Sequence, residues 1–254
     1  SIAATARNGG ILTPADEIDF DENIPPYQYD RKLYQNRVFT ADKADPTVEL
    51  VMGPNIMDWP EMPEMGKHLL VKVASSLKDP VTTTDELIPS GETSSYRSNP
   101  IRLSEFTLSR RDPGYVGRAK EVAALRERLA AGEAVQEVAD AISAAGLDVK
   151  PQDITLGSAV YAHKPGDGSA REQAASCQRV LGGAANFAKE YATKRYRSNL
   201  INWGIFPFLS DEILEQDEYV LVPNLREHVE QAGDSMEAYA IKDGKARPIT
   251  LKLG

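Results

Sequence analysis

The sequence has little of what marks several large classes of protein. It contains one cysteine, Cys177, which excludes an internal disulfide framework. A self-contained cubane iron–sulfur cluster is also excluded, because it needs about three or four cysteine ligands. No run of about 18 apolar residues is present, so we expect no transmembrane helix. Residues 1–7 lack the basic start and long apolar run of a signal peptide. A lone cysteine fits a reducing compartment, and we expect a cytoplasmic protein.

Basic charge is also scarce. The chain has 29 Lys and Arg residues against 38 Asp and Glu residues, which gives a net charge of −9. This balance argues against general nucleic-acid binding, where a basic field supplies most of the affinity. An acidic protein that binds an anion must do so with local arginines. The 254 residues, 41% hydrophobic and 26% charged, are otherwise ordinary for a soluble globular protein of one or two domains.

The first 64 residues lack a regular apolar period. Residues 2–6 are apolar and end at Asn8-Gly9-Gly10, a turn or helix stop. Residues 11–64 are acidic and contain several prolines, which predicts an extended arm or interdomain linker that lies on a surface. A disordered tail is the alternative. Scattered tyrosines and leucines, together with Trp59, favour an arm that is partly docked.

From Gly66 onwards, apolar strand patterns alternate with helical periods. The mixture predicts an α/β domain over residues 65–254. Expected strands lie at residues 68–73, 154–161, 184–191 and 218–222, followed by a hairpin of 236–242 and 246–253 that turns at Asp243-Gly244. Expected helices lie at residues 116–131, 134–145, 169–181 and 194–203. Residues 82–99 are rich in turn formers and are expected to form a long loop, a common place for functional residues.

A glycine-bearing loop joins the strand at 154–161 to the next helix. It reads Gly166-Asp167-Gly168-Ser169-Ala170-Arg171. A strand, such a loop and a helix together can bind anions, because free backbone N–H groups and the helix dipole point at the ligand. The loop matches neither a Walker loop nor G-x-G-x-x-G. From the local pattern alone, a serine cap at Ser169 with Glu172 three positions later is the favoured interpretation.

A second polar segment contains Asp85 and, twelve positions later, Arg97. Taken locally, it is a solvated turn with a surface arginine. Taken with the glycine-bearing loop, it resembles the C-terminal swivel domain of the aconitase superfamily. The resemblance covers residues 66–230. The residues that carry it are Thr83-Thr84-Asp85, Arg97, Gly166-Asp167-Gly168-Ser169-Ala170-Arg171-Glu172-Gln173-Ala174-Ala175, Leu181-Gly182-Gly183, and Asn199-Leu200 with Gly204 and Pro207.

This resemblance implies a fold and a division of the chain. The fold is a swivelling β/β/α domain over residues 65–254, as in the aconitase C-terminal domain. Residues 1–64 are similar to the end of a preceding domain followed by an extended interdomain linker.

The resemblance also implies a function, that of a hydro-lyase domain that binds substrate and supplies a base. Ser169 is implied to be the base and Asp85 a carboxylate that orients its neighbours. Arg97 and Arg171 are implied to bind substrate carboxylates, beside Gly168 and Ala170 on the recognition surface. The planar guanidinium fork suits carboxylate binding.

The family's 4Fe–4S cluster binds substrate as a Lewis acid and is held by cysteines outside this domain. We therefore expect this chain alone to bind no cluster, to hold no metal ligand, and to be inactive without the cluster-bearing N-terminal domains of the same enzyme. The expected substrate is a small di- or tricarboxylate, and neither a nucleic acid nor a membrane is an expected partner.

Three positions depart from the family pattern. Ala170 replaces a second serine, while Glu86 and Gln173 replace histidines. Interconversion of citrate and isocitrate through cis-aconitate is the leading expectation. A small subunit or domain of a homoaconitase or isopropylmalate-type dehydratase is the alternative, and so is a non-catalytic binding module. We interpret Cys177 as a packed thiol. The three histidines, His68, His163 and His228, show no metal-binding spacing.

Overall fold

A computed structural model describes residues 1–254 except 20–22, 39, 41, 43 and 170, and the side chain of Arg171 lies outside the description as well. The chain divides into two compact units, Ser1–Val51 and Met52–Gly254. The first unit has short helices α1 (Ile2–Arg7) and α2 (Lys32–Gln35), and none of its described residues is buried. The predicted domain boundary between residues 64 and 65 stays a prediction.

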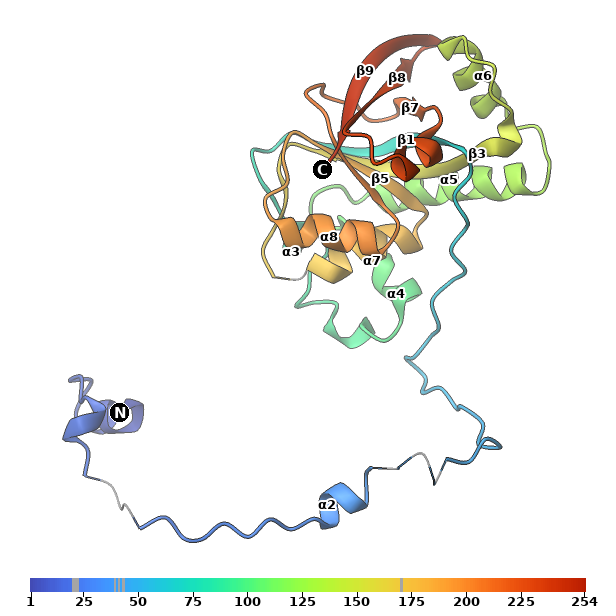
Figure 1. Ribbon diagram of the computed structural model, residues 1–254. Coiled ribbons are helices and arrows are strands. Elements are labelled where there is room, and N and C mark those ends of the chain that lie inside the picture. The colour runs from blue at the N-terminus through green and yellow to red at the C-terminus, as the bar shows by residue number, and fades with distance from the viewer. Residues whose placement is uncertain (20–22, 39, 41, 43, 170) are drawn as a thin grey trace. The chain divides into compact units, whose positions relative to one another are not determined.

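The second unit is built on a closed barrel of seven strands (Figure 1). Four neighbouring strands run parallel to one another, and three antiparallel strands complete the ring. Pairing of the first strand with the seventh closes it, with Leu69 opposite Val222. In spatial order the strands are β1 (His68–Leu77), β3 (Ile154–Ala162), β5 (Gly183–Ala188), β6 (Phe206–Leu209), β9 (Lys245–Leu253), β8 (Ser235–Lys242) and β7 (Tyr219–Val222).

Three apolar clusters form the core, one inside the barrel and two that pack helices against its outside. The first fills the barrel interior, where residues from all seven strands meet, among them Val71, Phe187 and Phe208. The second packs helices against the outside of the barrel and includes the fully buried Tyr115 and Tyr196. Burying a side chain of this size stabilises a fold by about 1.5–3 kcal/mol. The helices are α3 (Thr84–Leu87), α4 (Pro100–Ser104), α5 (Tyr115–Ala130), α6 (Gln136–Ala145), α7 (Arg171–Val180), α8 (Lys194–Asn202) and α9 (Leu225–Glu230).

Most expected elements are present, with their ends shifted by a few residues. The segment 82–99 differs, because it is not a simple loop. It contains strand β2 (Thr82–Thr83), helix α3 and the short 3-10 helix η3 (Ser94–Tyr96). A capping box begins α3, since the Thr83 hydroxyl oxygen accepts the Glu86 N–H and the Glu86 carboxylate accepts the Thr83 N–H. The helix expected at residue 169 begins at Arg171, and β6, α4 and α9 were not predicted.

Candidate active site

A two-stranded parallel sheet brings the two polar segments together. Strand β2 pairs with β4 (Pro165–Asp167), which places Thr83 opposite Asp167. The Thr82 N–H also donates to the Lys164 carbonyl at 3.0 Å. The Thr-Thr-Asp segment and the glycine-bearing loop therefore leave this small sheet side by side.

The first glycine of the loop packs against helix α8. Gly166 has a φ of +95°, and a Cβ there would lie 2.3 Å from the Tyr196 ring. The Tyr196 hydroxyl accepts hydrogen bonds from Gln178 Nε2 at 3.0 Å and Asn186 Nδ2 at 2.9 Å, and burial raises the pKa of that hydroxyl. The loop thus rests on a buried aromatic ring that is itself fixed, and only glycine can make this approach.

The second glycine packs against α3. Gly168 has a φ of +117°, and a Cβ there would lie 2.4 Å from Thr84 Oγ1. Thr84 is itself buried. The backbone between the β4 strand and Ser169 therefore lies directly on the helix that carries Asp85.

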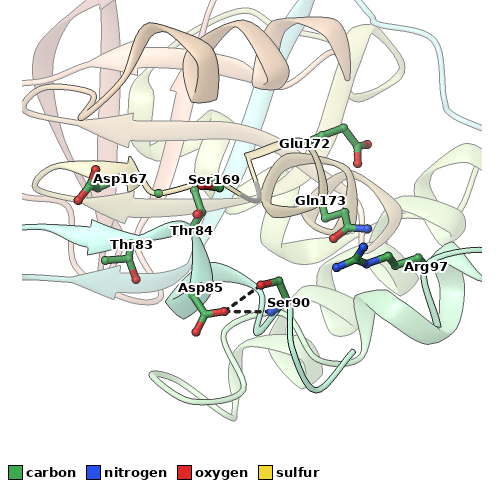
Figure 2. Close-up of a pocket in the computed structure, with 10 residues that line it drawn as sticks. Thr83, Thr84, Asp85, Ser90, Arg97, Asp167, Ser169, Glu172 and Gln173 are labelled. Carbon is green, nitrogen blue, oxygen red and sulfur yellow. Dashed lines mark hydrogen bonds between the residues drawn. The ribbon is translucent and has the colours of Figure 1, made fainter. Parts of the chain in front are cut away.

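A pocket of about 480 Å³ opens where these segments meet (Figure 2). Four of the six predicted site residues, Asp85, Arg97, Gly168 and Ser169, are among those that line it. Ala170 lies outside the described residues, and Arg171 begins α7 with a side chain that is not described. The full lining is Thr83, Thr84, Asp85, Ser90, Arg97, Asp167, Gly168, Ser169, Glu172 and Gln173.

Asp85 has both carboxylate oxygens engaged within the chain. Its Oδ1 accepts the N–H of Ser90 at 3.0 Å and the Ser90 hydroxyl at 3.2 Å, and its Oδ2 lies 2.5 Å from Arg110 Nη1. The hydrogen bond from the Ser90 backbone, assisted by the Ser90 hydroxyl and Arg110, lowers the pKa of Asp85. The carboxylate is therefore held ionised and oriented, which suits a positioning role better than that of a base.

Arg97 and Ser169 are exposed at the pocket. Within the part of the chain that the structure describes, neither side chain makes a hydrogen bond or an ion pair. Gln173 lines the same pocket, and Figure 2 shows the Arg97 and Gln173 side chains pointing toward one another. Ser169 stands two residues before α7, and the first N–H groups of an α-helix have no partner within the helix. The pocket therefore offers a guanidinium with unused donors and a hydroxyl near a helix start, a combination able to bind a carboxylate.

Of the two positions where a histidine is replaced, only one belongs to the pocket. Gln173 lines it, whereas Glu86 does not. Glu86 closes the capping box of α3, and one of its oxygens lies 3.3 Å from Arg111 Nε. The carboxylate at position 86 is thus explained by local structure.

Sequence reasoning missed Ser90 and Arg110. Ser90 lies five residues after Asp85 and meets it only because α3 ends at Leu87. Arg110 lies 25 residues away, and its contact with Asp85 depends on the turn before α5. No sequence signal indicates the contact of Ser90 with Asp85. For the contact of Arg110, the only signal is that Arg110 and Arg111 are consecutive arginines.

Cys177 does not fit a cluster ligand. It lies buried on α7, and burial raises the pKa of its thiol to about 12. Metal ligation requires the thiolate. Among the described side chains, no group of three or more His, Cys, Asp and Glu is arranged to hold a metal ion. No helix in the described ranges is long and apolar enough to cross a membrane.

Part of the chain matches a known protein family. Residues 124–212 match the family model of the aconitase C-terminal domain, a stretch that includes the loop from Gly166 to Arg171. The match confirms the predicted resemblance and the α/β swivel-domain fold. No curated protein sequence matches the chain. Among solved structures, the crystal structure of 3-isopropylmalate dehydratase from Methanocaldococcus jannaschii is similar at 18% identity and a TM-score of 0.45, over 74% of this chain and 83% of that one.

Proposed function

We propose, from the premise that residues 124–212 belong to the aconitase C-terminal domain family, that this chain supplies the substrate-binding and base-bearing part of an aconitase-like hydro-lyase. The observation that carries the proposal is the convergence of Asp85, Arg97, Gly168 and Ser169 on one pocket. These residues come from two segments far apart in the sequence. The resemblance implies a role for each of them.

The chemistry assigned to the chain is removal of a proton from the carbon next to a substrate carboxylate. Ser169 Oγ, as the alkoxide, takes that proton, and the electron pair of the broken C–H bond forms the C=C bond. The hydroxide that leaves the neighbouring carbon is taken up by an acid outside this chain. The pKa of a serine hydroxyl is far too high for an alkoxide to form in water. The alkoxide becomes accessible at a helix start, beside arginines and backbone donors, in a closed and dry site.

The exposure of the pocket supports a requirement for a partner. Ser169 and Arg97 face solvent in this chain. A base of high pKa needs water to be excluded, so another part of the enzyme has to cover this face. We propose that the cover is the part that carries the 4Fe–4S cluster, held by its own cysteines, because Cys177 does not fit the role of a ligand.

The proposed substrate is a small hydroxy acid with two or three carboxylates. Arg97 binds one carboxylate, and Arg171 is assigned to another. Citrate and isocitrate belong to this class, as do the substrates of homoaconitase and isopropylmalate-type dehydratases. Ala170 removes one hydroxyl from the recognition surface that the resemblance implies, and Gln173 lines the pocket together with Arg97, so selection within the class is assigned to these positions.

The test is turnover by the complete enzyme, with its cluster-bearing part present, on a panel of tricarboxylates and 2- or 3-hydroxy dicarboxylates. At least one member should be dehydrated or hydrated. Arg97→Gln should then raise KM for that substrate by about tenfold or more, because a charge-assisted pair with a carboxylate is lost. Arg97→Lys should recover only part of the loss.

The matched control for this test is Arg128→Gln. Arg128 is an exposed arginine on α5 that pairs with Glu133 and does not line the pocket. It should leave KM and kcat unchanged. Failure of the parent enzyme on every member of the panel, or an unchanged KM in Arg97→Gln, would overturn the proposal.

A further inference from the structure

Arg110 joins two acidic side chains beside the pocket without lining it. Its Nη1 lies 2.5 Å from Asp85 Oδ2, and its Nη2 lies 2.8 Å from Glu92 Oε1. Asp85 belongs to α3, and Glu92 belongs to the loop that follows. One planar guanidinium therefore connects the helix to the loop, in the forked geometry that arginine provides and lysine does not.

The same loop is tied to Asp85 a second time. Ser90 donates its N–H and its hydroxyl to the other oxygen of Asp85. The chain then continues through η3 to Arg97, with the Thr93 N–H bonded to the Pro89 carbonyl at 3.3 Å. Asp85 and Arg110 together hold the first part of a loop whose last part presents the pocket's unpaired guanidinium.

An unusual turn directs Arg110 toward α3. Leu108 is fully buried and has a φ of +57°, a conformation that is uncommon for leucine. Its N–H donates to the Leu87 carbonyl at 2.8 Å, and its own carbonyl accepts the N–H groups of Arg111 and Asp112. The turn is thus bonded to the end of α3, which places Arg110 within reach of Asp85.

The next residue provides a comparison within the same turn. Arg111 contacts Asp79 and Glu86, just as Arg110 contacts Glu92 and Asp85. Two consecutive arginines therefore hold two consecutive acidic residues of α3. The two acidic residues differ in position, because Asp85 lines the pocket and Glu86 does not.

We propose that Arg110 is a positioning residue, which fixes Asp85 and the loop from Ser90 to Arg97 so that the Arg97 guanidinium is held at the pocket. The inference rests on the function proposed above. The Arg110 and Asp85 side chains are 44% and 51% exposed, and an ion pair of that kind adds little to global stability. Its effect is therefore on the geometry of the site and not on whether the chain folds.

The kinetic test compares Arg110→Gln with Arg111→Gln in the complete enzyme. Arg110→Gln should raise KM by about five- to tenfold with a smaller change in kcat, since displacing a binding group by even an ångström is costly. Arg111→Gln should leave both constants within about twofold of the parent. Arg110→Lys should have a KM between those of the two glutamine variants, because an ammonium group cannot bridge both carboxylates. Equal effects of the two glutamine variants, or an unchanged KM in Arg110→Gln, would overturn the assignment.

A second readout does not depend on turnover. In the 254-residue chain, hydrogen exchange at the Ser90 and Tyr96 amides should be faster in Arg110→Gln than in the parent and unchanged in Arg111→Gln. The melting temperatures of the three proteins should be similar. If the parent enzyme turns over no substrate, the proposed function fails, and the exchange data still decide the positioning role. Unchanged exchange at Ser90 in Arg110→Gln contradicts that role whatever the kinetics show.

Discussion

At the scale of single residues, the site depends on backbone conformations that few side chains allow. Gly166 and Gly168 both have positive φ, and a Cβ at either would overlap a neighbouring side chain. The neighbours are Tyr196 on α8 and Thr84 on α3, the helices between which the loop lies. These two glycines let the loop approach both helices and so set where Ser169 stands.

Gly168→Ala should destabilise the chain by about 1–3 kcal/mol, because it combines an unfavourable φ with a Cβ 2.4 Å from Thr84 Oγ1. Denaturant unfolding measures the change. Gly117→Ala is the matched control, since Gly117 is an exposed residue inside α5 with nothing within 4 Å of an added Cβ. It should stabilise the chain by about 0.5–1 kcal/mol. Equal stability of the two variants would contradict this account of the loop.

Individual site residues could be predicted only in part. Asp85, Arg97, Gly168 and Ser169 were expected from ordered motifs, and the structure places all four at one pocket. The contacts of Asp85 could not be predicted. They depend on the positive φ of Leu108, which turns Arg110 back toward α3 and which no residue in that turn signals.

At the scale of elements, the segment before the first strand is docked by one aromatic contact and two hydrogen bonds to its backbone. The Trp59 ring lies 4.5 Å from the Trp203 ring, which directly follows α8. The Met57 N–H donates to the Ser98 carbonyl at 3.0 Å, next to Arg97, and Arg179 Nη2 donates to the Pro63 carbonyl at 3.3 Å. Of the arm expected over residues 11–64, residues 57–63 thus contact the rest of the second unit.

Trp59→Ala should make residues 52–64 more sensitive to limited proteolysis, because the ring contact with Trp203 is lost. Trp59→Phe keeps an aromatic face and should retain most of the protection. The two tryptophans of the sequence are the two that touch, so intrinsic fluorescence reports on this contact. A parent-like cleavage rate and unchanged emission of Trp203 in Trp59→Ala would show that the contact does not dock the segment.

Elements with clear apolar patterns can be predicted from the sequence, and those that contain a proline or are only one turn long cannot. Helices α5, α6 and α8 and strands β1 and β3 follow their apolar periods. Strand β6 was missed because it contains Pro207, a residue that normally argues against a strand. Helix α3 is only four residues long. Thr83 and Glu86 have the spacing of a capping box, but the turn formers around them predict a loop over residues 82–99.

At the scale of the whole molecule, the closed barrel was not predictable from local pattern. Closure depends on β7 pairing with β1, which are about 150 residues apart, and such a contact leaves no local signal. The resemblance supplied the fold instead, and the match over residues 124–212 confirms it. The net charge of −9 sets a further condition, since an anionic substrate has to be held by local arginines in an acidic protein.

We propose that Ser169 removes a proton from the substrate when the rest of the enzyme covers the pocket. The most direct measurement is kcat of the complete enzyme carrying Ser169→Ala, beside Ser143→Ala on the exposed face of α6 as the control. Ser169→Ala should lower kcat by about 10²–10⁴-fold, the range expected for removal of a general base, and Ser143→Ala should leave kcat unchanged. Turnover by Ser169→Ala close to that of the parent would contradict it.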